Sequence, residues 1–202
     1  MSKKTLIWFI VGWVFLKLLN YYYVPYFILA LELLVLDLTL FILVIIHTVK
    51  LFKERKAIKK LRIHKILLYI TLLVLMCFNY ETNYFIEKVD WVVFYNKRSN
   101  IVEQVKLKKI NPNVSWNDGL CELPFEFPIV SNGGNDIWID RNKDNGDVTV
   151  TFWVFRNFFN APSTQFIYTN DPVRISAIKE KILKNPLDNW KIKENWFRTF
   201  ER

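Results

Sequence analysis

The stretch DIWIDRNKDNGDVTVTFWV, residues 136–154, decides the fold of the C-terminal part of this chain. Apolar residues alternate with other residues on both sides of a polar segment, which is typical of two antiparallel strands joined by a turn. A register in which paired residue numbers sum to about 287 sets Ile137 opposite Val150. The same register sets Ile139 opposite Val148, so apolar side chains meet across the strands. The stretch therefore predicts a β-hairpin.

Further elements are predicted on both sides of this hairpin. Apolar residues recur at helical spacing over residues 81–109, and Asn111-Pro112-Asn113 is a helix-ending segment. Residues 164–169 are rich in β-forming side chains and predict another strand, and residues 190–200 predict a last one. Together these elements predict a small α+β domain with an antiparallel sheet over residues 81–202.

A second helix is predicted to follow the strand at residues 164–169. Asp171 and Pro172 are typical of an N-cap and a first helical position. Isoleucines at helical spacing predict one apolar stripe, and Asn185-Pro186 predicts the end of the helix. The stripe consists of Ile175, Ile178 and Ile182.

Positive charge is concentrated in the first 80 residues. They carry 11 basic and 3 acidic side chains, a net charge of +8, whereas residues 81–202 carry 17 and 16, a net charge of +1. Eight of the basic residues lie between Lys50 and Lys65, in a stretch that separates apolar runs. Short cationic loops stay on the cytoplasmic side of a membrane. Because the excess positive charge is confined to one such loop and the C-terminal part is nearly neutral, nucleic acid is disfavoured as a partner.

Three apolar runs, at about residues 5–23, 26–49 and 64–80, predict three transmembrane helices in a domain spanning residues 1–80. The third is the shortest run, and if it does not span, residues 81–202 stay in the cytoplasm. We expect it to span, which predicts a multi-pass inner-membrane protein with a cytoplasmic N-terminus and an extracytoplasmic α+β domain. A signal peptide is the competing interpretation of the first run. Asn20 and three tyrosines, rather than a small-residue cleavage site, argue against it.

Three ionisable residues lie within the first two runs: Lys17, Glu32 and Asp37. In an antiparallel hairpin, Lys17 and Glu32 fall at equal depth, so they are predicted to pair and to fix the register of the two helices. Asp37 has no basic partner at its depth. It is predicted either to hold a homo-oligomer together as a neutral side chain or to serve a functional site.

The chain contains two histidines, His47 and His64, both beside the basic loop and neither in residues 81–202. This excludes Ser-His and Cys-His nucleophile pairs and histidine-ligated zinc from the C-terminal part. We expect no metal and no cofactor. The two cysteines, Cys77 and Cys121, lie in different parts of the chain, so no disulfide within the domain is predicted.

Several polar segments have a functional and a structural interpretation. Asp140, Asn142, Asp144 and Asp147 resemble a calcium loop, but Asn145 and Thr151 occupy the glycine and glutamate positions, so a hairpin turn is preferred. The SNGGN segment at residues 131–135 is a turn signal in which an anion-binding nest is the alternative. Glu122 and Glu126 are a candidate carboxylate pair for acid–base catalysis, without further support.

Two of the six tryptophans beyond residue 80 form a candidate binding face. Trp138 and Trp153 lie opposite the aliphatic rows of the predicted hairpin. If no helix or strand covers that side, they offer an aromatic surface to a partner or a glycan. A sheet covered on both faces is the alternative.

Several short motifs occur together in the C-terminal part: Arg98-x-x-Ile101-Val102, Leu123-Pro124, Ser131-x-Gly133-Gly134, a strand at residues 148–156 and Phe166-x-Tyr168. With these motifs the chain resembles a group of uncharacterised small bacterial multi-span membrane proteins with a C-terminal α+β domain. The resemblance covers residues 95–200 and implies a shared fold and no known activity, so it assigns no catalytic residue. The chain is also similar, in size and layout but in no motif, to membrane accessory proteins of RNA-targeting CRISPR systems, which implies a role in antiviral defence.

These observations lead to one expected function and two alternatives. We expect a non-enzymatic, membrane-anchored binding or sensing protein that forms homo-oligomers through its helices and engages a protein or envelope partner. A membrane effector or channel-like accessory protein, with Asp37 lining a pathway, is the first alternative. An envelope enzyme that uses Glu122 and Glu126 is the second.

Overall fold

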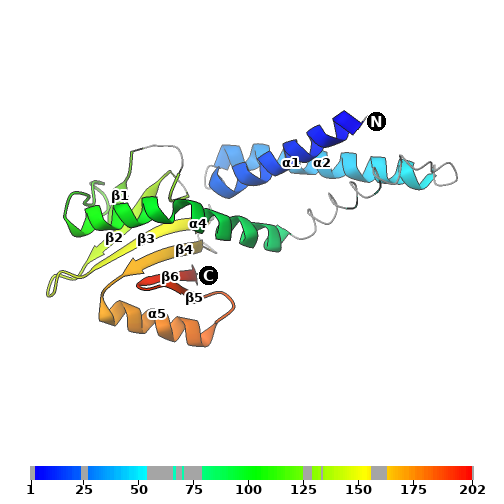
Figure 1. Cartoon of the computed structure of the whole chain (residues 1–202). Helices are drawn as coiled ribbons and strands as arrows, with labels where there is room; N and C mark the ends of the chain where they lie inside the picture. The colour runs from blue at the N-terminus through cyan, green and yellow to red at the C-terminus, as the bar shows by residue number, and fades with distance from the viewer. Residues whose placement is uncertain are drawn as a thin grey trace. The chain divides into compact units, whose positions relative to one another are not determined.

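The computed structural model describes residues 3–23, 27–53, 66, 70, 79–124, 129–132, 134–155 and 163–201. The chain forms two compact units, Met1–Tyr21 with Phe27–Lys88 and Tyr22–Tyr26 with Val89–Arg202. Figure 1 shows the helices and strands that the described residues form, with α4 and α5 in the C-terminal part of the chain.

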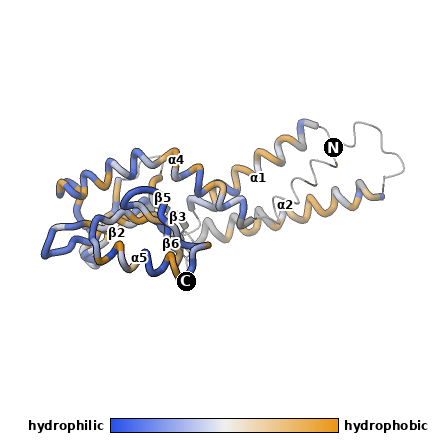
Figure 2. Tube along the Cα trace, turned by 60° about the horizontal axis from the view of Figure 1, so that its bottom comes forward, coloured by the Kyte–Doolittle hydropathy of each residue, from blue (hydrophilic) through white to orange (hydrophobic). Residues whose placement is uncertain are grey.

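The first unit contains most of α1 (Lys3–Tyr23), α2 (Phe27–Lys53) and the first turns of α4 (Asn79–Lys106). Hydrophobic residues run along both α1 and α2 (Figure 2). Trp13, Lys17 and Tyr21 are buried and recur every four residues, so they share one face of α1. Large apolar side chains elsewhere on both helices are exposed. They are Ile7, Trp8, Val11, Val14, Phe15 and Leu18 in α1, and Leu31, Leu34, Val35, Leu38, Phe41, Ile42, Ile45, Ile46, Val49 and Phe52 in α2.

The structure corrects the prediction of three transmembrane helices. Across the described ranges, no helix combines the length and the apolar character that crossing a bilayer requires. Ionisable residues inside the runs are the physical reason, because Lys17 in α1 and Glu32 and Asp37 in α2 are expensive to place in hydrocarbon. The predictions of a multi-pass inner-membrane protein and of an extracytoplasmic domain are therefore wrong. Most of the third run and of the basic loop lies outside the described residues.

The second unit is built on an antiparallel sheet, which has six strands among the described residues, in the order β1-β2-β3-β4-β6-β5. The short strand β1 at its edge was not predicted. The strands are β1 (Leu120–Glu122), β2 (Asp136–Arg141), β3 (Val148–Phe155), β4 (Ser163–Thr169), β5 (Trp190–Lys193) and β6 (Trp196–Glu201).

Strands β2 and β3 form the predicted hairpin, but the predicted register is wrong by two residues. Ile137 pairs with Phe152 rather than Val150, and Ile139 pairs with Val150. The turn occupies residues 142–147, after the last pair of the ladder, Arg141 with Val148. A shift of two residues leaves each side chain on its predicted face, so the alternation of the sequence cannot detect it.

Helix α4 covers one face of the sheet, on the side opposite α5 (Figure 1). Trp91 of α4 contacts the rings of Phe166 on β4 and Trp196 on β6, with centroids 4.9 and 5.1 Å apart. Val102 and Val105, further along α4, are fully buried. The aliphatic rows of the hairpin face this side, and their buried members are Ile137, Ile139, Val148, Val150, Phe152 and Val154.

The long helix predicted over residues 81–109 corresponds to α4, which ends at Lys106 and thus earlier than predicted. Lys108 has a φ of 58°, the left-handed conformation that often follows a helix end. Nη2 of Arg141 donates hydrogen bonds to the carbonyl groups of Val105 (2.6 Å) and Ile110 (3.2 Å). A guanidinium at this position adds a charged donor at the C-terminal end of the helix and complements its dipole.

Helix α5 (Pro172–Lys184) confirms the predicted helix and its cap. The Asp171 side chain accepts a hydrogen bond from the Val173 main-chain N–H (2.9 Å), and Asn185 is the C-cap. The predicted apolar stripe packs on the face of the sheet opposite α4. The cluster comprises Ile167, Ile175, Ile178, Ile182 and Phe197.

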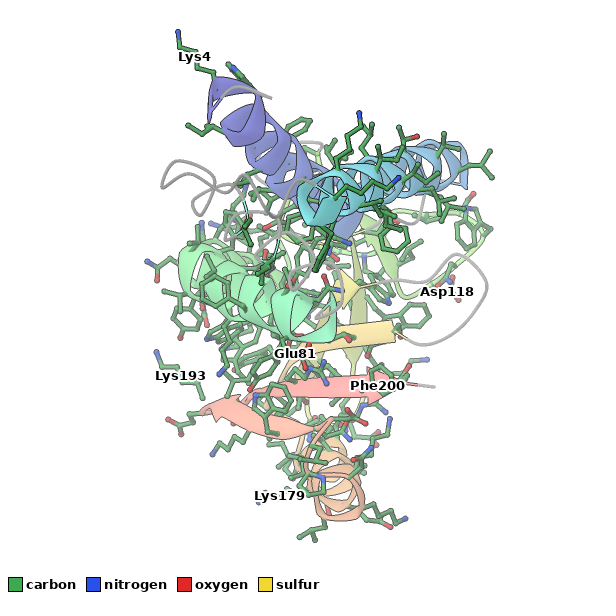
Figure 3. All side chains as sticks on the ribbon, turned by 90° about the vertical axis from the view of Figure 1, so that its right-hand side faces the viewer. Lys4, Glu81, Asp118, Lys179, Lys193 and Phe200 are labelled. Atoms are coloured by element: carbon green, nitrogen blue, oxygen red, sulfur yellow. The ribbon has the colours of Figure 1, made fainter. Side chains whose placement is uncertain are left out.

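The tail forms a hairpin rather than the single strand that was predicted over residues 190–200. Asn195 has a φ of 60° and lies in the turn between β5 and β6. Asparagine adopts this conformation more readily than most residues, and the sequence pattern on either side did not reveal the turn. Nζ of Lys193, beside this turn, donates a hydrogen bond to the Tyr95 hydroxyl of α4 (2.9 Å), and Figure 3 shows Lys193 at the end of the hairpin.

Candidate binding surface

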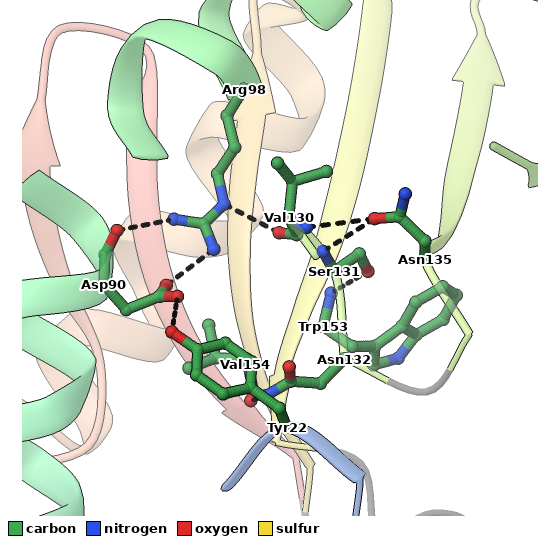
Figure 4. A network of polar contacts seen from close by, with 9 residues as sticks. All are labelled: Tyr22, Asp90, Arg98, Val130, Ser131, Asn132, Asn135, Trp153 and Val154. Carbon is green, nitrogen blue, oxygen red and sulfur yellow. Dashed lines mark hydrogen bonds and ion pairs between the residues drawn. The ribbon is translucent and has the colours of Figure 1, made fainter. Parts of the chain in front are cut away.

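A buried ion pair joins two turns of α4 to other segments of the second unit (Figure 4). Nη2 of Arg98 lies 2.6 Å from Oδ2 of Asp90, and both side chains are 2% exposed. Nε of Arg98 donates a hydrogen bond to the Val130 carbonyl (2.9 Å), and the Tyr22 hydroxyl donates one to Oδ1 of Asp90 (2.9 Å). The network therefore connects α4, within the second unit, to the segment before β2 and to Tyr22.

Burial dominates the electrostatics of this network. It raises the pKa of Asp90, although Arg98 and the hydrogen bond from Tyr22 act in the opposite direction. It also raises the pKa of Tyr22, and the nearby Asp90 carboxylate adds to this effect. Because the carboxylate and the guanidinium are engaged with each other away from solvent, the arrangement positions segments of the chain and offers no group to a substrate.

The segment at residues 131–135 uses its polar groups inside the protein (Figure 4). Oδ1 of Asn135 accepts hydrogen bonds from the main-chain N–H groups of Val130 (3.0 Å) and Ser131 (3.4 Å). The Asn132 N–H donates to the Trp153 carbonyl (2.7 Å), and the Asn132 side-chain amide donates to the carbonyl of Val154. These amides are therefore not free to bind an anion as the nest alternative requires. Gly133 lies outside the described residues.

Trp138 lies on the sheet face that α4 does not cover. It is 38% exposed, although it lies within β2, between β1 and β3. One side of its ring rests on Gly119, where an added Cβ atom would lie 2.6 Å from ring atoms Cε2 and Cζ2. The absence of a Cβ atom at Gly119 therefore lets the indole approach the backbone before β1 closely, while the side chain stays 38% exposed.

Trp116 lies three residues before Gly119 and is 74% exposed. It occupies a tight turn in which the Asn117 N–H donates a hydrogen bond to the Val114 carbonyl (3.2 Å). Three residues span at most about 11 Å, so the Cα atom of Trp116 lies within that distance of Gly119, which contacts Trp138. We call Trp116 and Trp138, together with Gly119, the tryptophan surface.

Trp153, the second tryptophan predicted to form a binding face, is half-buried. Its main-chain N–H donates a hydrogen bond to Oγ of Ser131 (2.9 Å). Other tryptophans are structural, because Trp91 and Trp196 pack in the core and Trp190 stacks on Arg198, with 4.6 Å from Cζ to the ring centroid. Trp116 was not singled out by its sequence context, where Asn111-Pro112-Asn113 signalled only a loop.

The edge of the sheet beside the tryptophan surface is closed by one side chain. Oδ1 of Asn113 accepts a hydrogen bond from the Glu122 N–H (2.8 Å), and its Nδ2 donates to the Glu122 carbonyl (2.9 Å). The Asn113 N–H also donates to the Leu120 carbonyl (3.2 Å). Backbone groups with which a partner strand would pair are therefore occupied, and recognition at this end depends on side chains.

The ionisable residues predicted in the first two runs lie in α1 and α2. Lys17 is buried, with its Nζ 5.5 Å from the ring centroid of Trp13. The side chains of Glu32, Asp37 and His47 lie outside the described part, as does all of His64. The pairing of Lys17 with Glu32 and the role of Asp37 thus stay predictions.

The acidic segment after β2 is a polar hairpin turn. Oδ1 of Asn142 accepts a hydrogen bond from the Asp144 N–H (3.0 Å), and Gly146 has a φ of 76°. Within the described ranges, no three His, Cys, Asp or Glu side chains are grouped so that they could hold a metal ion. Glu122 is exposed on β1, whereas Glu126 lies outside the described residues, so their pairing is not tested.

Comparisons of this chain with protein-family models, with curated proteins and with solved structures found no match. The two resemblances drawn from the sequence thus stay predictions.

Proposed function

We propose that this chain is a non-enzymatic binding protein whose second unit recognises a protein partner through the tryptophan surface. The observation that carries the proposal is the exposure of Trp138, at 38%, on a sheet face that α4 leaves open. Tryptophan is among the residues most enriched at the centres of protein interfaces, because it buries a large apolar area and keeps a polar N–H.

The shape of the tryptophan surface favours a protein over a small molecule. Trp116 projects from a tight turn and is 74% exposed, which suits insertion into a pocket of a partner. Trp138 contacts Gly119 and is itself 38% exposed. Two exposed indoles differ from the concave sites that enclose small ligands.

The interior of the second unit supports binding rather than catalysis. Its strongest ionic group, the Asp90–Arg98 pair, is satisfied by the protein itself and is 2% exposed on both sides. The polar side chains of Ser131, Asn132 and Asn135 are likewise buried and engaged with main-chain groups. These residues define a rigid scaffold, which is what a preorganised binding surface needs.

Site-specific photo-crosslinking tests this proposal in cells that produce the full chain. A photoreactive phenylalanine analogue replaces Trp116, Trp138 or, as a matched control, Val173 on α5, which is 75% exposed. We expect one protein to be captured from positions 116 and 138 and not from position 173. Equal labelling at all three positions, or none at the first two, would contradict the proposal.

A titration of the captured protein then measures the contribution of each indole. Trp138→Ala and Trp116→Ala are each expected to weaken binding at least about 30-fold, as interface tryptophans do. Val173→Ala is the control and is expected to leave the affinity unchanged. Urea unfolding of each variant separates loss of binding from loss of structure.

A further inference from the structure

Seven large apolar side chains form a regular line along α2. They follow one another at alternating steps of four and three residues, and each is between 42% and 68% exposed. We call this line the α2 seam. It consists of Leu31, Val35, Leu38, Ile42, Ile45, Val49 and Phe52.

The spacing of the α2 seam is that of a coiled coil. Alternating steps of three and four average 3.5 residues, so the line stays on one side of a helix that supercoils with a left-handed twist. The seam extends over residues 31–52, which is about three heptads. Packing within a folded unit requires only the buried face of a helix to be apolar. It does not explain a second apolar line with this spacing on the exposed face.

The residue types along the seam specify the kind of coiled coil. One set of alternate positions holds only β-branched side chains, Val35, Ile42 and Val49. The other set consists of Leu31, Leu38, Ile45 and Phe52, so leucine occupies its first two positions. β-Branched residues at one core position and leucine at the other favour two parallel strands, and the first half of the seam follows this rule.

We infer that α2 pairs with α2 of a second copy of this chain in a parallel, two-stranded coiled coil. Each seam residue then meets its own counterpart, and the knobs of one helix enter holes of the other. Lys53, beside the last seam residue, faces the neutral Thr48 of the other copy rather than a second lysine. The parallel arrangement therefore brings no like charges together across the seam.

The exposed apolar area along these helices approaches that of a dimer interface. Large apolar side chains bury roughly 60–120 Å² each when they leave water completely. The seven side chains of the α2 seam and four more on α1 are 40–68% exposed. They offer on the order of 300–700 Å² per copy, compared with about 800 Å² per partner in a standard interface.

Part of this area lies on α1 and continues the same pattern. Ile7, Val11, Val14 and Leu18 are exposed at steps of four, three and four residues. A second helix with the same period gives the first unit two helices able to contribute to one interface, as in helical bundles. The seam on α2 is the longer of the two and therefore sets the register.

Sedimentation equilibrium of the purified full chain measures the stoichiometry directly. We expect the mass of two chains for the unmodified protein. Leu38→Glu and Ile42→Glu each place a carboxylate in the dimer core, so we expect each to raise the dissociation constant at least about 100-fold. Lys50→Glu, next to the seam on the same helix, is the matched control and is expected to remain dimeric. Circular dichroism checks that every variant keeps its helices.

Disulfide trapping tests the parallel arrangement independently of stability. Single cysteines at position 31, 38 or 52 are introduced into a chain in which Cys77 and Cys121 are replaced by serine. In a parallel pair each single-cysteine variant crosslinks with itself, whereas Lys50→Cys does not. Crosslinking only in a mixture of the Leu31→Cys and Phe52→Cys chains would overturn the parallel arrangement.

Three further outcomes would overturn the inference. One is an unmodified chain that sediments as a monomer over the accessible concentration range. Another is a dimer that survives both glutamate variants with unchanged affinity. The third is a monomer that floats with phosphatidylcholine vesicles, because the occupant of the seam would then be lipid and not a second copy.

Discussion

Replacing Asp90 with alanine removes the only carboxylate that the described structure places against the Arg98 guanidinium. Arg98 is 2% exposed, so its charge would remain buried without a counterion. Breaking a buried pair from one side costs about 3–5 kcal/mol. Arg98 keeps its hydrogen bond to the Val130 carbonyl (2.9 Å), so we expect a loss near the lower end, about 3 kcal/mol. A loss of this size reduces the ratio of folded to unfolded chains by roughly a hundredfold.

Urea unfolding followed by tryptophan fluorescence measures this loss. Six of the eight tryptophans, including the packed pair Trp91 and Trp196, lie in the second unit, so most of the signal reports the unit that contains the ion pair. Glu180→Ala provides the matched control, since it removes the carboxylate of the pair with Lys184, whose side chains are 66% and 74% exposed. Exposed pairs of this kind contribute little, and no measurable change is expected.

A double replacement separates the charge effect from simple loss of packing. Asp90→Leu combined with Arg98→Met removes both charges and keeps an apolar filling, so it is expected to recover most of the stability lost in Asp90→Ala. A single variant that unfolds at the same urea concentration as Glu180→Ala would refute the reasoning. So would a double variant less stable than Asp90→Ala.

Three substitutions and one change of pH have expected outcomes. Asp171→Ala removes the N-cap of α5 and is expected to cost about 1 kcal/mol in urea unfolding, with a loss greater than about 3 kcal/mol contradicting a capping role. Gly119→Ala places a Cβ atom 2.6 Å from the Trp138 ring and is expected to cost about 1–3 kcal/mol and to shift indole fluorescence. Gly12→Ala, where nothing lies within 4 Å, is expected to stabilise α1 by about 0.5–1 kcal/mol, measured by helical circular dichroism on heating. Burial, followed by nearby carboxylates, raises the pKa of the Cys121 thiol in the folded chain. The neutral thiol therefore contributes fully to the free energy of unfolding below the unfolded-state pKa of about 8.5. This contribution is lost as the pH rises from there through the higher folded-state pKa. Urea unfolding between pH 7.5 and 10 checks this prediction. The stability of the unmodified chain should fall more with rising pH than that of Cys121→Ala, which lacks the thiol.

Local patterns in the sequence predicted individual elements well where the chemistry was local. The cap at Asp171 and the apolar stripe of α5 follow from neighbouring residues, and the structure contains both. The β2–β3 register did not follow, because a period of two gives the same faces after a shift of two. The turn at Asn195 was missed because one asparagine among β-forming residues gives no pattern of its own.

Long-range contacts explain what sequence reasoning missed in the candidate surface and in the interior. Arg98 and Asp90 are eight residues apart on one helix, but their burial depends on Val130 and Tyr22, which come from distant segments. The exposure of Trp138 depends on which helix covers which half of the sheet. Neither the burial of the ion pair nor the exposure of Trp138 leaves a pattern in the neighbouring sequence. The heptad spacing of α2 is such a pattern, but the overall apolarity of the helix obscured it.

The amide of Asn113 has a consequence beyond the closing of one edge. It imitates a short piece of a seventh strand, so lateral growth of the sheet stops at a single side chain. Asn113→Asp would keep the oxygen and lose the donor, which would leave the Glu122 carbonyl available to a foreign backbone. The carboxylate introduced there would itself discourage strand pairing, so charge would then protect the edge in place of a hydrogen-bonded amide.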